Sequence, residues 1–260
     1  MQLVLRNADS KIRTTFTGPD GEVATPTSPK VTIVRDSDGE TIADAASATV
    51  ESGGVASYTI SAEDIPEVDR LTVAWSAADA SAPNDVVEVV GGFLCSLEAI
   101  DPDADPSDSR RLREQAELWL EDACGVAFRP RYERETIDAR GSTSLLLSRP
   151  LVSAVLSASD DGTAIDVDDL TVGEVVSQPS CFTGLVDIAY AHGYAAPPEP
   201  IKRAVIKLAQ FASSGDSDRV TRFAEDDQQF WLTVGGVGGA ATSIPEVNAA
   251  IEAYGFASVA

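Results

Sequence analysis

The segment Glu98-Ala99-Ile100-Asp101-Pro102-Asp103-Ala104-Asp105-Pro106 separates two parts of the chain with different sequence patterns. Its two prolines interrupt regular structure, and its four acidic side chains cannot be buried together. We therefore expect a domain boundary here, with one domain in residues 1–95 and a second in residues 96–260.

Before this boundary, short runs with β-forming patterns alternate with turn sequences rich in glycine and aspartate. In Leu71-Thr72-Val73-Ala74-Trp75 the large apolar side chains occupy every second position, which predicts a half-buried strand with Trp75 in the core. The first domain is predicted to be an all-β sandwich of the immunoglobulin-like type. Its expected strands are Lys11–Phe16, Lys30–Arg35, Ala48–Val50, Ala56–Ile60, Arg70–Trp75 and Val86–Phe93.

Directly after the boundary the sequence predicts a helix. Asp105 is expected as its N-cap, Pro106 as its first helical residue and Gly125 as its C-terminal cap. Apolar residues at helical spacing are expected to face the core. They are Leu112, Ala116, Trp119, Leu120 and Ala123.

Strand-like patterns return between residues 129 and 190, and two further helices are expected after them. One helix begins at Pro200; the other follows the glycine-rich residues 235–241, with Ser243 and Glu246 as a capping box and Gly255 at its end. The chain is thus predicted to be an α+β protein of two domains. The expected strands of the second domain are Glu135–Asp138, Ser144–Leu147, Val152–Ser157 and Leu185–Tyr190, with a hairpin turn at Asp160-Asp161-Gly162.

The net charge of −23 argues against tight binding of nucleic acid, because that binding depends on Lys and Arg contacts to phosphates.

No apolar run is long enough to span a bilayer, and no secretory signal is visible at the start. The three cysteines have no metal-binding spacing, and we expect them to be buried thiols in a reducing compartment.

We find no pattern that supplies an enzymatic site, a metal site or a cofactor site. The single histidine, His192, is interpreted as a loop residue with a local hydrogen bond. The sequence Gly236-Val237-Gly238-Gly239-Ala240-Ala241 imitates a dinucleotide motif, but too little chain follows it for a βαβ unit, so we interpret it as a hinge. The acidic turn at residues 36–40 is interpreted as solvated, with loose calcium binding left open.

Three arginines, Arg110, Arg111 and Arg113, lie in the early turns of the first expected helix, where the helix dipole disfavours positive charge. Two interpretations remain open. The arginines pair with acidic residues of their own helix, or they contact an acidic neighbouring subunit.

Two stretches of the C-terminal part carry a likeness to a known family. One runs from Arg111 to Arg131 and is a helix that ends in Cys124-Gly125-Val126-Ala127-Phe128-Arg129-Pro130-Arg131. The other is Val186-Asp187-Ile188-Ala189-Tyr190-Ala191-His192-Gly193-Tyr194, which leads through Pro197-Pro198 into the helix at Ile201. In these stretches and in the order of its elements, the C-terminal part, about residues 96 to 255, resembles the head-to-tail connector (adaptor) family of tailed bacteriophages.

This resemblance implies a connector-type domain of about three helices with inserted strands and a C-terminal arm. It implies a structural virion protein that forms a ring, a dodecamer, below the portal protein. The ring extends the channel for the genome DNA and receives a head-closure (stopper) or other neck and tail-completion protein. In relatives the C-terminal segment contacts the portal, which makes Phe230, Trp231 and Tyr254 candidate contact residues, with a core role for Tyr254 equally open.

The implied location is the head-tail neck of the virion, assembled in the host cytoplasm. The N-terminal sandwich is not part of the minimal family pattern, and its contact with the ring exterior, the capsid or the tail is left open. The alternative function is a secreted or virion-surface adhesin or decoration protein built on a β-sandwich.

Overall fold

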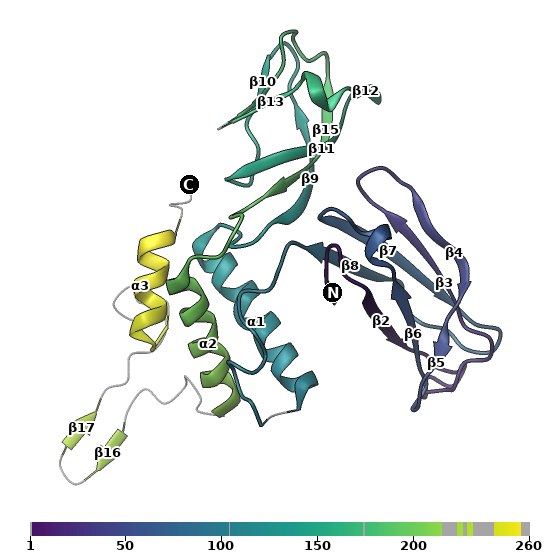
Figure 1. The fold of residues 1–260 in the computed structure, drawn as a ribbon, viewed down its shortest axis with the longest axis vertical. Coiled ribbons are helices and arrows are strands. Elements are labelled where there is room, and N and C mark those ends of the chain that lie inside the picture. Colours follow the sequence, from purple (N-terminus) through teal and green to yellow (C-terminus); the bar gives the residue numbers. More distant parts are fainter. Residues whose placement is uncertain are drawn as a thin grey trace. The chain divides into compact units, whose positions relative to one another are not determined.

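The computed structural model describes residues 2–103, 105–173, 175–214, 223–225, 228–230 and 242–255. These residues form a mixed α+β protein with three α-helices and several β-sheets (Figure 1). The chain folds as two compact units, and each is built from two separate stretches of sequence. Unit 1 comprises Met1–Gly92 and Pro130–Gly193, and unit 2 comprises Phe93–Arg129 and Tyr194–Ala260.

The first break between the units, after Gly92, lies close to the boundary expected at residue 95. Residues 130–193 differ from the expected arrangement, because they belong to unit 1 together with the N-terminal strands. These residues make a set of polar contacts with the N-terminal part, described below, and share a small apolar cluster with it, in which Val68 packs with Tyr132 and Ala189.

The N-terminal part of unit 1 consists of two sheets. A five-stranded sheet has the order β1-β8-β7-β3-β4, and a three-stranded sheet has the order β2-β6-β5. Strand β1 is parallel to β8, whereas β3, β7 and β8 pair in antiparallel register. The strands are β1 (Gln2–Leu5), β2 (Ser10–Thr15), β3 (Lys30–Arg35), β4 (Thr41–Ser47), β5 (Thr49–Val50), β6 (Val55–Ile60), β7 (Asp69–Ser76) and β8 (Asp85–Val90), with a short 3-10 helix at Ala62–Asp64.

Both sheets contribute to one apolar core, which makes this part a two-sheet sandwich. Ile12 and Ile60 come from the smaller sheet, and Leu71, Val73 and Trp75 come from β7 of the larger sheet. Leu71 and Val73 are fully buried and Trp75 is 6% exposed, so the predicted alternation and the predicted core tryptophan are confirmed. Strands β1 and β4 were not expected from the sequence.

Residues 130–193 form two further sheets, which we call the inserted sheets. A four-stranded sheet has the order β12-β11-β15-β9, and a three-stranded sheet has the order β10-β14-β13. The predicted hairpin turn is confirmed, because Asp160 pairs with Thr163 and both Asp161 and Gly162 have positive φ. The strands are β9 (Arg131–Asp138), β10 (Ser144–Leu145), β11 (Val152–Asp160), β12 (Thr163–Ile165), β13 (Thr171–Val172), β14 (Val176–Ser177) and β15 (Leu185–His192), with a 3-10 helix at Val167–Asp169.

Unit 2 contains helices α1 (Pro106–Cys124), α2 (Glu199–Ser214) and α3 (Pro245–Tyr254), and the short paired strands β16 (Phe223–Glu225) and β17 (Gln228–Phe230). Helix α2 packs against both α1 and α3. The predicted ends of α1 are confirmed: the Asp105 carboxylate accepts a hydrogen bond from the Ser107 amide at 2.7 Å, and Gly125 caps the helix in the left-handed region at φ 65°.

The predicted apolar stripe of α1 is wrong in part. Ala116 and Leu120 are buried as expected, but Trp119 is 40% exposed and Ala123 is also exposed. The buried face is rotated so that it includes three charged residues. They are Arg113, Glu117 and Glu121.

The predicted capping box of α3 is also wrong. The N-cap residue is Ile244, which has no side-chain cap, and the preceding turn is held by Thr242 and Asn248 instead. The Thr242 amide donates to the Asn248 side chain at 2.9 Å, which ties the first turn of the helix to the residues before it. Gly255 ends the helix as expected.

No helix in the described stretches is both long enough and apolar enough to cross a membrane.

Candidate functional site

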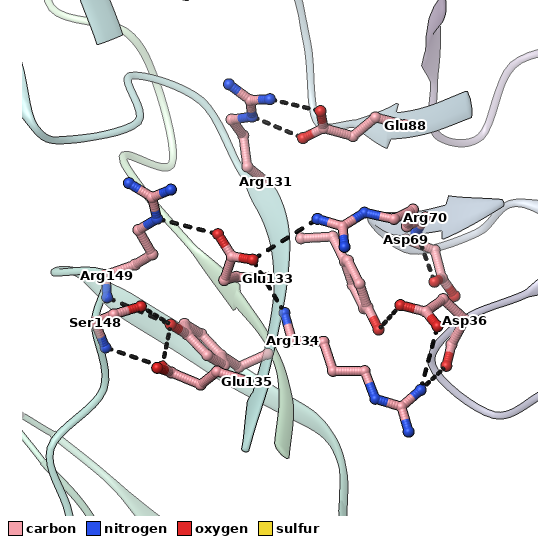
Figure 2. Close-up of polar contacts among 12 residues, drawn as sticks. Asp36, Asp69, Arg70, Glu88, Arg131, Glu133, Arg134, Glu135, Ser148 and Arg149 are labelled. Carbon is pink, nitrogen blue, oxygen red and sulfur yellow. Dashed lines mark hydrogen bonds and ion pairs between the residues drawn. The ribbon is translucent and has the colours of Figure 1, made fainter. Parts of the chain in front are cut away.

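Polar side chains join the sandwich to the inserted sheets within unit 1 (Figure 2). The contacts converge on strand β9, whose first residues alternate between the two sides of the sheet. We call this set of residues the polar seam. It consists of Asp36, Ser37, Arg70 and Glu88 of the sandwich and Arg131, Tyr132, Glu133, Arg134 and Ser157 of the inserted sheets.

The pair Arg131–Glu88 joins the first residue of β9 to β8. Two parallel hydrogen bonds run from the guanidinium to the carboxylate, at 2.7 Å from Nε and 2.5 Å from Nη2. The side chains are only 16% and 5% exposed, so water screens this pair weakly. Beside it, the Gly91 amide donates to the Pro130 carbonyl at 2.9 Å, which brings the two backbones into contact.

Arg134 connects three elements. Its Nη1 donates to the Asp36 backbone carbonyl, and its Nη2 and Nε donate to the Asp187 carboxylate on β15 at 2.6 and 3.0 Å. These hydrogen bonds lower the pKa of Asp187 and raise that of Arg134. The bridge therefore stays ionised at neutral pH and orients the turn at Asp36 against the inserted sheets.

Tyr132 lies buried between these charges. Its hydroxyl donates to the Asp36 carboxylate at 3.0 Å, and the Arg70 guanidinium lies 5.6 Å from its ring centre. Burial, and then the nearby Asp36 charge, raises the pKa of Tyr132. Arg70 also pairs with Glu133 at 3.7 Å.

A second polar group lies within the inserted sheets, beside the seam (Figure 2). The Tyr190 hydroxyl donates to the Glu135 carboxylate at 2.7 Å, and the Ser148 amide donates to the same carboxylate at 2.9 Å. Arg149 donates to Glu133 at 3.0 Å, which links this group to the seam. The Tyr190 hydroxyl also accepts a hydrogen bond from the Arg149 amide at 3.3 Å, so this group holds the segment around Ser148 and Arg149 against β9 and β15.

A small pocket of about 180 Å³ lies at one end of the seam. Asp69 lines this pocket and is 5% exposed. The Ser37 amide and hydroxyl both donate hydrogen bonds to the Asp69 carboxylate, but burial has the larger effect and raises the pKa of this carboxyl. Among the described residues, no three His, Cys, Asp or Glu side chains gather in a way that could hold a metal ion. The pocket is lined by Arg35, Ser37, Asp38, Ile65, Pro66, Glu67, Val68, Asp69 and Leu156.

Unit 2 holds a buried ionic cluster of its own. Arg129, 1% exposed, donates to Glu117 at 2.6 Å, and its Nε lies 3.7 Å from Glu121. Backbone amides also bind the two carboxylates: the Leu94 amide donates to the second oxygen of Glu117, and the Phe128 amide donates to the Glu121 oxygen that lies near Arg129. This cluster fastens the chain on both sides of α1 to the helix.

The three expected contact arginines have different positions. Arg110 is exposed, and Arg111 is exposed with an Asp108 oxygen 3.6 Å away in the same helix. Arg113 differs from the expectation of a surface residue, because it is 6% exposed, lies 3.5 Å over the Phe93 ring and is 3.9 Å from Glu117. Pairing within the helix, one of the two interpretations offered above, is thus observed for Arg111 and Arg113.

The structure describes two of the three expected portal-contact residues, Phe230 and Tyr254. Phe230 is the last residue of β17, opposite Phe223, whereas Trp231 and the hinge at residues 235–241 lie outside the described residues. Tyr254 packs on the core of unit 2 and meets the Phe128 ring edge-on, with ring centres 6.1 Å apart.

The prediction that His192 is a loop residue with a local hydrogen bond is wrong. It ends strand β15, is 5% exposed, and its Nδ1 has no hydrogen-bond partner. Burial, together with the positive charges of Arg149 and Arg131, lowers the pKa of His192 to about 4.

The cysteines were expected to be buried, and only Cys124 is. Cys95 is half-buried and Cys181 is exposed. Burial raises the pKa of both Cys95 and Cys124 to about 11, so these two thiols are weak nucleophiles.

The sequence analysis did not predict the polar seam. The available signal was the charged, alternating run Arg131-Tyr132-Glu133-Arg134-Glu135, which places basic side chains at the start of a strand. Their partners Asp36 and Glu88 are far away in sequence, and no local pattern connects them.

Comparison of the chain with protein-family models found no match, and a search among curated proteins found none either.

Proposed function

We propose that this chain is a head-to-tail adaptor of a tailed bacteriophage, with an immunoglobulin-like sandwich at its N-terminus. It acts as a structural virion protein, forms a ring below the portal, and joins the capsid to the neck and tail. In this proposal the connector-type part comprises the three helices and the inserted sheets, and the sandwich is an addition to it.

The observation that carries the proposal is the position of the stretch that resembles the family. Within Cys124-Gly125-Val126-Ala127-Phe128-Arg129, all residues except Gly125 are buried, and Gly125 caps α1. Phe128 stacks with Tyr194 of the second resembling stretch at 5.5 Å between ring centres. Phe128 and Tyr194, one from each resembling stretch, thus lie in the same core of unit 2, as expected of a shared fold determinant.

The order of elements supports the same proposal. A helix, a set of inserted strands, a second helix and a C-terminal helix follow one another along residues 106–254. The polar groups described above are engaged in structural contacts, which suits a protein that acts by shape. The proposed partners are further copies of the chain, the portal protein, and a stopper or tail-completion protein.

The proposed ring surrounds DNA without binding it tightly. A chain with 42 acidic and 19 basic residues repels phosphates, and such a lining lets DNA pass. In this setting the polar seam holds the sandwich on the inserted sheets, so that the added part moves with its subunit.

The test is to image the purified full-length chain by negative-stain electron microscopy, alone and mixed with portal rings, and to measure its mass by light scattering. The proposal predicts closed rings of uniform size, alone or on the portal. A chain that remains monomeric and does not bind the portal would contradict it. Glycan-array binding by such a monomer would favour an adhesin.

A further inference from the structure

The pocket at the end of the polar seam contains a buried charge without a counter-ion. Asp69 of β7 lines this pocket and is 5% exposed. Among the described residues, no lysine, arginine or histidine forms an ion pair with its carboxylate. The other buried carboxylates of the described residues, Glu88, Glu117 and Glu121, each lie against an arginine. Because a buried charge is costly unless it is paired, Asp69 stands out among them.

Three uncharged donors hold the Asp69 carboxylate in place. Its Oδ1 accepts hydrogen bonds from the Ser37 and Arg70 amides, and its Oδ2 accepts one from the Ser37 hydroxyl. These donors orient the carboxylate but leave its charge unbalanced. A carboxylate has about four acceptor positions, so Oδ2 has room for one further donor.

The charges around the pocket are mainly negative. Besides Asp69, the carboxylates of Asp38 and Glu67 belong to the lining. Arg35 is the only cation among the lining residues that the structure describes, and it pairs with Asp38 at 3.0 Å and also with Glu40. Its charge is therefore already balanced, and the pocket attracts cations.

The size and the apolar part of the lining limit what fits. Ile65 and Val68, both 1% exposed, line the pocket together with Leu156 of β11. Pockets for drug-sized ligands usually measure about 300–1,000 Å³. At about 180 Å³, this pocket suits a group of the size of one side chain.

We propose that this pocket binds a primary ammonium group on a short alkyl stem. The ammonium donates to Oδ2 of Asp69 and balances its charge, and the stem packs on Ile65, Val68 and Leu156. A guanidinium fits less well, because its paired donors bind best to a carboxylate with both oxygens free. The same chemistry comes from two sources, a lysine side chain of a partner protein or a free alkylamine, and the experiment separates them.

The experiment titrates the isotope-labelled, full-length chain with small probes. The NMR signals of the Ser37 and Arg70 amides report on the pocket, because both amides donate to Asp69. The probe n-butylammonium carries the ammonium on its stem, n-butanol has the same stem without charge, and n-butylguanidinium is the alternative cation. The probe Nα-acetyl-lysine N-methylamide represents a lysine within a chain. About 0.15 M sodium chloride reduces non-specific attraction to the acidic surface.

Two variants test whether the carboxylates of the pocket are responsible for binding. Asp69→Asn removes the buried charge at nearly equal volume. Glu67→Gln removes a charge whose side chain is 66% exposed, so this variant folds even if the first does not. The matched control is Asp44→Asn on β4, because Asp44 is exposed, lies outside the pocket and changes the net charge equally. Circular dichroism verifies that the chains are folded.

The expected result is a saturable shift of both amide signals with n-butylammonium, and weaker binding of n-butanol and n-butylguanidinium. Asp69→Asn should weaken the affinity for n-butylammonium by about tenfold or more, as loss of a charged hydrogen bond does. Glu67→Gln should weaken it by about two- to fivefold, the effect of an exposed charge pair. Asp44→Asn should leave the affinity unchanged.

The probes also separate the two sources of the ammonium. A lysine derivative that binds at least as tightly as n-butylammonium assigns the pocket to a partner's lysine. A lysine derivative that binds more weakly assigns it to a free alkylamine. Both results support the inference.

Other results would overturn the inference. They are the absence of saturable shifts in the native chain, and equal or tighter binding of n-butanol or n-butylguanidinium. Unchanged affinity in Asp69→Asn overturns it as well, and so does unchanged affinity in Glu67→Gln where Asp69→Asn does not fold. The adaptor proposal is independent of these results, because the titration concerns a pocket within unit 1 and not assembly.

Discussion

Arginine side chains pair with acidic residues inside this fold. Arg131 and Arg134 join parts of unit 1, and Arg129 and Arg113 lie against the carboxylates of α1 in unit 2. Because a buried charge without its partner is costly, each pair constrains which segments can lie together. These contacts act beside shared apolar packing, which joins Val68 to Tyr132 in unit 1 and Leu120 to Phe128 in unit 2.

His192 offers a prediction at the same scale. Its pKa is lowered from about 6.5 to about 4 by burial, so between these values the unfolded chain binds a proton that the folded chain does not. The free energy of unfolding should therefore fall as the pH is lowered through this window, by roughly 1.4 kcal/mol per pH unit at most. The measurement is the free energy of urea unfolding of the full-length chain at several pH values, for the native sequence and for the variant His192→Gln.

The variant should show a flatter pH dependence, while the titrating carboxylates act equally in both chains. Since the chain has one histidine, its imidazole resonance in an NMR titration is unambiguous. A midpoint near 6.5 would show that the side chain is solvated, contrary to this prediction.

At the scale of elements, the junction of β8 with β9 depends on a glycine. A Cβ added to Gly91 would lie 2.6 Å from the Pro130 ring, whereas one added to Gly92 would have no atom within 4 Å. The two neighbouring glycines therefore form a matched pair for testing the contact between the sandwich and the inserted sheets.

Gly91→Ala should destabilise unit 1 by about 1–3 kcal/mol, the usual cost of forcing an extra carbon into a packed site. Gly92→Ala should change stability by less than about 0.5 kcal/mol. Urea unfolding measures both, and hydrogen exchange of the Gly91 amide reports on its bond to Pro130. Equal effects of the two substitutions would mean that the close approach is not maintained in solution.

In helix α1 the two ends depend on local contacts, whereas the buried face depends on residues outside the helix. Its caps, Asp105 and Gly125, bond to residues within the same few positions, and the sequence predicted them correctly. Its buried face was predicted incorrectly because Arg129 and Phe93, outside the helix, attract Glu117, Glu121 and Arg113 inward. Local hydrogen bonds are readable from sequence, whereas a buried ion pair with a residue outside the helix is not.

For the whole molecule, the net charge of −23 leads to a prediction about salt. The Debye length falls from about 10 Å at 0.1 M salt to about 3 Å at 1 M. Because copies of like charge repel one another, added salt screens this repulsion and should strengthen self-association through surfaces other than charge pairs. The measurement is sedimentation velocity of the full chain at about 0.05 M and about 0.5 M sodium chloride.

The opposite response would point to another contact. Self-association through Arg110 and Arg111 with acidic neighbours should weaken as salt screens the attraction. Reversing both arginines to glutamate is the matching control, since it should disrupt assembly only in that case.

Local sequence patterns were sufficient to predict the α+β class, both ends of the strand Lys30–Arg35, the alternating core of β7 and the ends of α1. Each of these depends on neighbours a few positions apart, through side-chain alternation or capping. Strands β1 and β4 were not predicted because their sequences carry only a weak strand pattern. Strand β1 pairs with a parallel strand more than eighty residues away, and β4 contains Asp44 among alanines.

The packing of residues 130–193 with the sandwich, by contrast, is seen only in the folded molecule. Arg134 could have paired with many of the 42 acidic residues, and nothing near it in sequence selects Asp36 and Asp187. The physical reason is that ion pairs and close backbone contacts act through space. Their partners are fixed by the simultaneous packing of all the strands.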